Sequence, residues 1–120
     1  MVRLSLALLA LSGLAACGGG SRGYHPRGGY SSSPVLFAEG PISAACLRSG
    51  RNAATHARCG CVQAVANRSL SNSEQRRGAV FFGDPHRAQQ VRQSSRASDE
   101  SFWLDWKEFG TSAEALCSST

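Results

Sequence analysis

The stretch THARCGCVQAVANRSL, residues 55–70, decides the fold that we expect for this chain. Small and apolar side chains recur in it at three- and four-residue spacing, which predicts one amphipathic helix. They are Val62, Val65, Ala66 and Ser69. The same helix carries Cys59 and Cys61, so disulfides from these two cysteines would join it to other parts of the chain.

Helices are also predicted on both sides of this stretch. Pro41 has the favourable first-turn position of a short helix, and Gly50 ends that helix. Ser71 and Glu74 have the spacing of a capping box, which predicts a helix that ends at Gly83.

Two further helices complete the expected fold. Asp84 and Pro85 are an N-cap and a first-position proline for a helix that ends near Gln93. Ser98 precedes a last helix of about twenty residues, whose apolar positions recur at helical spacing. These positions are Phe102, Trp106, Phe109, Ala113 and Leu116. Because no alternating strand pattern and no internal repeat occurs, the sequence predicts an all-α domain over residues 41–120, a small bundle of about five short helices.

The N-terminus has the pattern of an export signal. Arg3 precedes an apolar run over residues 4–14, which is shorter than the ~20 residues of a membrane span. The sequence Leu14-Ala15-Ala16-Cys17 then resembles the lipobox of bacterial lipoproteins, in which the cysteine takes a diacylglyceryl group and the preceding peptide is removed. The resemblance implies a signal peptide over residues 1–16 and a membrane anchor on Cys17, palmitate included. Gly18 stands where inner-membrane lipoproteins commonly have aspartate, which favours the periplasmic side of the outer membrane.

Residues 17–40 are predicted to form a tether behind the lipidated Cys17. Glycine and serine dominate them, so a flexible chain with a root-mean-square span of ~25 to 30 Å is expected. The apolar patch over residues 35–37 is expected to dock on the helical domain. Removal of residues 1–16 takes Arg3 away, so 12 of the 13 basic residues remain against 8 acidic ones, a net charge of +4.

The remaining cysteines, Cys46, Cys59, Cys61 and Cys117, predict two disulfides, because an even count in a small exported domain is typical of a disulfide framework. A Cys59–Cys61 bond is excluded, since helical side chains two residues apart point about 200° away from each other. Two inter-helix pairings remain. We favour Cys59 with Cys117 and Cys46 with Cys61, because Cys59 lies nearer the apolar face expected to meet the last helix. The swapped pairing stays open.

Two other uses of these cysteines are disfavoured. A redox pair needs an exposed, activated thiol, which a helix joined to two others does not offer. A zinc site with His56 would need Cys59 and Cys61 to face one ion, which helical geometry prevents. We therefore expect no metal and no cofactor.

Five arginines are expected on the third and fourth helices: Arg76, Arg77, Arg87, Arg92 and Arg96. Guanidinium groups bind phosphate and carboxylate through paired hydrogen bonds, so this stripe is a candidate surface for an anionic envelope component or an envelope protein. A solvated polar face is the alternative. Nucleic acid is excluded as a partner by the expected location.

Trp103 lies beside the apolar stripe of the last helix, next to Asp99 and Glu100, which makes it a candidate interface anchor or a half-buried packing residue. His86, close to Asp84, is the nearest approach to a catalytic cluster. No nucleophile elbow, phosphate-binding glycine loop or paired-carboxylate motif occurs, so the sequence predicts no enzyme.

Several short segments together resemble an uncharacterised family of short Gram-negative, alphaproteobacterial-type lipoproteins, over residues 40–117. They are Cys59-Gly60-Cys61-Val62-Gln63, Val65-Ala66-Asn67, Gln75-Arg76-Arg77, Phe81-Phe82, Asp84-Pro85-His86 and Ser98-Asp99-Glu100-Ser101-Phe102-Trp103. Members of that family can carry the name "arginine transporter", which here would imply at most a carboxylate-and-indole pocket around Asp99, Glu100 and Trp103. The resemblance implies no catalytic residues.

The expected function is that of a lipid-anchored, disulfide-linked helical module that binds another envelope component without chemistry of its own. The alternative is an accessory role in the uptake of a small solute such as arginine. The sequence gives no indication of an oligomeric state.

Overall fold

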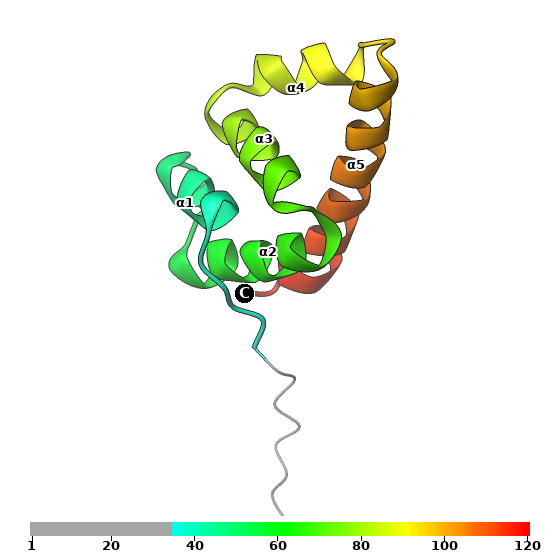
Figure 1. The fold of residues 1–120 in the computed structure, drawn as a ribbon. Coiled ribbons are helices and arrows are strands. Elements are labelled where there is room, and N and C mark those ends of the chain that lie inside the picture. Colours follow the sequence, from blue (N-terminus) through cyan, green and yellow to red (C-terminus); the bar gives the residue numbers. More distant parts are fainter. Residues whose placement is uncertain (1–34) are drawn as a thin grey trace, which may run out of the picture. The chain divides into compact units, whose positions relative to one another are not determined.

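The computed structural model describes residues 35–120, which form five α-helices and no strand within that range (Figure 1). The predicted all-α fold is therefore confirmed. The signal peptide, Cys17 and the tether up to residue 34 lie outside the described residues. The helices are α1 (Pro41–Arg48), α2 (His56–Ser69), α3 (Asn72–Gly83), α4 (Pro85–Arg92) and α5 (Ala97–Cys117).

The helices pack around one small core. Helix α1 contacts α2 and α3, α2 also contacts α5, and α4 joins the end of α3 to the start of α5. In Figure 1, α2 and α4 lie at opposite ends of the domain, and α3 and α5 run between them. None of the described helices is long and apolar enough to cross a membrane. The core consists of Ile42, Cys61, Val65, Ala66, Leu70, Phe109, Ala113 and Cys117.

Helix α1 is capped by a side chain from α2. The Oε1 atom of Gln63 accepts hydrogen bonds from the backbone N–H groups of Ile42, at 2.8 Å, and Ser43, at 3.0 Å. Two otherwise unpaired donors at the helix start are thereby satisfied. Gly40 leaves room for this contact, since a Cβ there would lie 2.8 Å from the Gln63 amide. At the other end, Gly50 has φ 69° and ends the helix as predicted.

The Gln63 amide also continues into a buried polar network between α2 and α3. Its Nε2 donates to Gln75 Oε1 at 2.7 Å and to Asn67 Oδ1 at 2.9 Å. Gln75 Nε2 in turn donates to the carbonyl oxygen of Leu70 at 3.3 Å. Because these buried amide groups are paired, the network holds α1, α2 and α3 in register without the cost of an unsatisfied polar group.

The predicted capping box of α3 is present. Ser71 Oγ accepts from the backbone N–H of Glu74 at 3.3 Å, and Glu74 Oε2 accepts from that of Ser71 at 2.7 Å. The hydrogen bond from the Ser71 backbone lowers the pKa of the Glu74 carboxyl. Asp84 is the N-cap residue of α4 and Pro85 its first residue, as predicted, but the Asp84 side chain makes no cap hydrogen bond. Its carboxylate lies beside Arg87 instead, with Oδ2 3.8 Å from Nε.

Helix α5 begins before Ser98, the residue predicted to precede it. Arg96 is its N-cap residue, and Ser98 lies inside the first turn. The turn before the helix accounts for this difference: Ser94 Oγ accepts a hydrogen bond from the backbone N–H of Arg96 at 3.2 Å, so the chain has already turned there. Asp99 and Glu100 then lie in the first turn, where the helix dipole favours negative charge.

Two disulfides join α2 to its neighbours, but the pairing that we favoured is wrong. The bonds are Cys46–Cys59 and Cys61–Cys117, with Cα–Cα distances of 5.6 and 5.8 Å. Positions four residues apart share a helix face. Cys59 therefore shares the face of Gln63, which meets α1, whereas Cys61 lies on the core face toward α5. The prediction failed because it assigned Cys59 to the face that meets α5.

Residues 35–40 lie along α2 before the chain enters α1. The backbone N–H of Ala38 donates to the carbonyl oxygen of Gly60 at 3.0 Å, and Leu36 packs against the core. The Phe37 ring covers Gly60, where an added Cβ would lie 2.2 Å from the ring. Val35 is 83% exposed, so only the last two residues of the apolar patch dock on the domain.

Candidate binding surface along α3

An aromatic cluster fills the space between α3 and α5. Trp106 on α5 lies against four phenylalanine rings, and none of these four ring-centroid distances exceeds 6.4 Å. Such pairs add to the stability that comes from the burial of apolar area. The four partners are Phe81, Phe82, Phe102 and Phe109.

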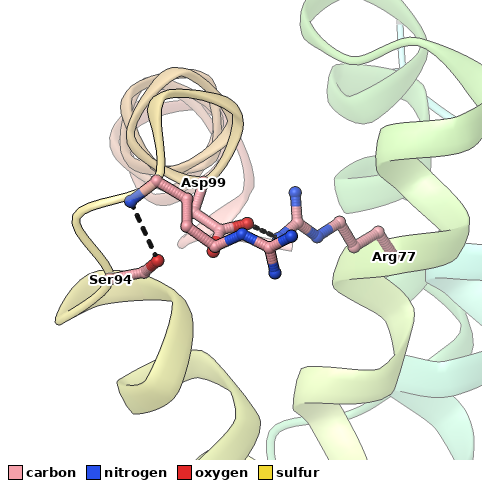
Figure 2. Close-up of polar contacts among 4 residues, drawn as sticks. Arg77, Ser94 and Asp99 are labelled. Atoms are coloured by element: carbon pink, nitrogen blue, oxygen red, sulfur yellow. Dashed lines mark hydrogen bonds and ion pairs between the residues drawn. The ribbon is translucent and has the colours of Figure 1, made fainter.

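Arg77 links the same two helices at the edge of the cluster. Its Nη2 donates to Asp99 Oδ1, and its guanidinium carbon lies 4.4 Å from the centroid of the Phe102 ring. Figure 2 shows the Arg77 side chain extending from α3 toward Asp99 on α5. Hydrogen bonds from Ser94 and from Arg77 lower the pKa of the Asp99 carboxyl. The Arg77 side chain is therefore held in place before any ligand arrives.

Three adjoining hollows open along α3, with volumes of about 210, 210 and 220 Å³. The α3–α4 hollow shares Val80 with the α1–α3 hollow and Phe81 with the aromatic hollow, and we call the three hollows together the α3 surface. The α3–α4 hollow is lined by Arg77, Val80, Phe81, Arg87, Gln90 and Val91. The α1–α3 hollow is lined by Ala45, Arg48, Ser49, Ala79, Val80 and Gly83. The aromatic hollow is lined by Arg51, Phe81, Phe82 and Trp106.

The α3 surface combines positive charge with apolar floors in two of its three hollows, the α3–α4 and the aromatic one. Four arginines line its hollows, and none of the described residues that line them is an aspartate or a glutamate. Val80 separates two of the hollows and is 48% exposed. A surface of this kind can take an anion that also has an apolar part, because guanidinium groups pair with carboxylate and phosphate oxygens.

Only part of the predicted arginine stripe contributes to this surface. Arg77 and Arg87 line the α3–α4 hollow, whereas the other three arginines of the stripe are exposed and line none of the three hollows. Arg48 and Arg51 were missed by the sequence analysis. They lie in α1 and in the turn after it, far from the stripe in sequence, and only the packing of α1 on α3 brings them to the same surface.

The other candidate residues lie apart from the hollows. Trp103 is half-buried on α5, and His86 is exposed in the first turn of α4. Asp99, the carboxylate proposed for an arginine ligand, is already paired with Arg77. Within residues 35–120, no group of three or more histidine, cysteine, aspartate or glutamate side chains is placed to hold a metal ion.

The fold and its two disulfides define a small, disulfide-linked, all-α domain. No protein-family model matches the chain, and neither a curated protein nor a solved structure matches it significantly. The resemblance to short Gram-negative lipoproteins stays a prediction.

Proposed function

We propose that this protein is a lipid-anchored protein of the cell envelope, without enzymatic activity, that binds an anionic partner through the α3 surface. The observation that carries this proposal is the lining of the three hollows: four arginines and no carboxylate among the described lining residues. The four are Arg48, Arg51, Arg77 and Arg87.

The charge distribution along the chain supports an anionic partner. Residues 75–98 contain five arginines and a single acidic residue, Asp84. The Asp84–Arg87 pair is exposed, and exposed pairs contribute little to stability. Arg87 can therefore turn toward an incoming anion at little cost. Such a local excess of positive charge also attracts anions over a distance and speeds their association.

The location in the envelope rests on two features. The N-terminal sequence that ends in Leu14-Ala15-Ala16-Cys17 has the length and composition of a lipoprotein signal. Two disulfides in so small a domain are typical of proteins exported to an oxidising compartment. A lipid on Cys17 would then keep the domain at the membrane and bring it repeatedly to the same envelope partners.

The alternative, an accessory role in arginine uptake, would need a free carboxylate. Of the two carboxylates expected in such a pocket, Glu100 is exposed and lines none of the three hollows. The other, Asp99, is already paired with Arg77, whose guanidinium group also contacts Phe102. An arginine ligand would have to displace Arg77 from this position. We therefore place the anionic partner first.

A titration with two probes tests this proposal. The full-length lipidated protein, in zwitterionic nanodiscs, is titrated with polyglutamate and with free arginine in a calorimeter. Polyglutamate is expected to bind, with an affinity that falls steeply as salt is raised, because the contacts are charge-assisted and partly exposed. Free arginine is expected not to bind. Binding of arginine without binding of polyglutamate would reverse the order of the two functions.

A further inference from the structure

We propose that the partner of the α3 surface is an acidic segment of another protein, whose apolar side chains enter the hollows while its carboxylates pair with the surrounding arginines. This inference rests on the proposed function and names the chemical class of the partner. Its motivation is that the α3 surface has separate hollows as well as positive charge.

The size of the hollows favours single side chains. Each has a volume of about 210 to 220 Å³. Pockets that hold drug-sized molecules have volumes of roughly 300–1,000 Å³. Each hollow is therefore smaller than a pocket for a drug-sized molecule, but it has room for one leucine or phenylalanine side chain.

The α3–α4 and aromatic hollows have mainly apolar floors, whereas the α1–α3 hollow is lined about equally by polar and apolar atoms. Phe81 is buried and forms part of the floor of both the α3–α4 hollow and the aromatic hollow. Val80 rises between the α3–α4 and α1–α3 hollows with about half of its surface exposed. Two apolar side chains of one segment, one on each side of Val80, would cover this exposed surface.

The arginines are placed to pair with carboxylates between those side chains. Arg48 lines the hollow on one side of Val80, and Arg77 and Arg87 line the hollow on the other. Arg77 is held by Asp99 and by the ring of Phe102, so little side-chain entropy is lost when it binds a second anion. In a segment that alternates acidic and apolar residues, the carboxylates can pair with these arginines while the apolar side chains enter the hollows beside them.

A membrane surface fits these features less well. The hollows open on both sides of the Val80 ridge, between different pairs of helices. A lipid headgroup layer would reach the exposed arginines, but it would leave the apolar floors covered by water. A phosphate polymer without apolar groups would likewise contact the arginines and leave the apolar floors in contact with water.

The test compares two peptides of equal charge. In one, glutamate alternates with leucine; in the other, serine replaces every leucine. Each is titrated against the full-length protein in zwitterionic nanodiscs, and binding to empty nanodiscs is subtracted. The leucine peptide is expected to bind at least about tenfold more tightly, because even one partly buried leucine contributes that much.

Val80→Ser should remove most of this difference in affinity and leave the affinity for the serine peptide unchanged. Leu104→Ser, at an exposed leucine on α5, is the matched control.

Each outcome decides between the two proposals. Equal, salt-sensitive binding of both peptides would overturn the inference and leave the proposed function standing. Binding of neither peptide would overturn both. Vesicles that contain phosphatidylglycerol form a third arm, and tighter binding to them than to the leucine peptide would assign the surface to a lipid. The peptide comparison on the unaltered protein is decisive even where the Val80→Ser variant fails to fold.

Discussion

The indole of Trp106 on α5 lies directly against Gly78 on α3, so closely that a Cβ added at Gly78 would be 1.9 Å from Cζ3 of the indole. A glycine inside a helix costs about 1 kcal/mol relative to alanine. In this position the cost is offset, because the absence of a side chain lets Trp106 reach the phenylalanine rings around it. The contact also sets the separation of α3 and α5, and thereby the floor of the aromatic hollow.

Gly78→Ala is therefore expected to destabilise the protein although alanine favours helices. Overpacking of this kind costs about 1–3 kcal/mol, which outweighs the gain in helix propensity. Gly110→Ala is the matched control, since an added Cβ meets nothing within 4 Å at that position of α5, and it should stabilise the protein by about 0.5–1 kcal/mol. Urea unfolding followed by circular dichroism measures both. A Gly78→Ala variant as stable as the Gly110→Ala variant would contradict the packing described for Trp106.

The two disulfides are expected to contribute unequally. In the chain-entropy model, the Cys61–Cys117 bond, with a sequence separation of 56 residues, is worth about 4 kcal/mol. The Cys46–Cys59 bond, with a separation of 13, is worth about 3 kcal/mol. The double variant Cys61→Ser/Cys117→Ser should therefore unfold at lower urea concentration than Cys46→Ser/Cys59→Ser.

Peptide mapping without reduction checks the pairing itself: a Cys59–Cys117 peptide, or free thiols, would refute it.

Two aspartates on α5 should affect stability in opposite directions. The pKa of Asp99 is lowered by Ser94 and Arg77, so its charged form stabilises the fold at neutral pH, and this contribution is lost as the pH falls through the lowered pKa. The pKa of Asp105 is raised by desolvation and by the nearby Glu74, so its charged form opposes folding at neutral pH.

Asp99→Asn is therefore expected to lower the melting temperature at pH 7, and Asp105→Asn to raise it. Both differences should shrink as the pH is lowered: that of Asp105→Asn already as the pH approaches the usual aspartate pKa of about 4, and that of Asp99→Asn only below it, as the pH falls through the lowered pKa of Asp99. Differences of the same sign at pH 7 for the two variants would show that the charges around α5 are not arranged as described.

The lipid anchor is tested through Cys17. Cys17→Ser should prevent acylation and cleavage after residue 16, and the protein should no longer be retained in the membrane as a lipoprotein. Membrane fractionation and mass spectrometry of the N-terminus measure these changes. Release of the unaltered protein as a soluble species with an unmodified cysteine would contradict the anchor.

Local signals predicted the helices well, apart from the start of α5 near Ser98, and the larger failures concerned contacts between residues distant in sequence. Pro41, Gly50 and the Ser71–Glu74 capping box act over a few residues, so they could be recognised in the sequence. Which face of α2 meets α1 and which meets α5 is set by packing, and the sequence does not indicate it. Cys59 and Cys61 lie on different faces, so assigning Cys59 to the wrong face exchanged the two disulfide partners. The ion pair of Arg77 with Asp99 joins residues 22 positions apart and had no local signal.

The α3 surface was predicted only in part for the same reason. The arginine stripe included Arg77 and Arg87, the two of its five arginines that line the α3–α4 hollow, because both helices had clear boundaries in the sequence. Arg48 joins them through the packing of α1 on α3, which no pattern within one helix could indicate. Each hollow is lined by residues from more than one segment of the chain, so the sequence pattern of a single helix could not predict it.

The measurement that tests the central claim most directly compares two charge reversals in the binding of polyglutamate by the full-length lipidated protein. Arg87→Glu alters a residue of the α3–α4 hollow, whereas Arg68→Glu makes the same change of net charge at an exposed arginine that lines none of the three hollows. The α3 surface predicts a loss of affinity of about tenfold or more for Arg87→Glu, as expected for a lost charge-assisted hydrogen bond, and a loss of less than about threefold for Arg68→Glu. Equal losses in the two variants would contradict the account, because net charge alone would then explain the binding.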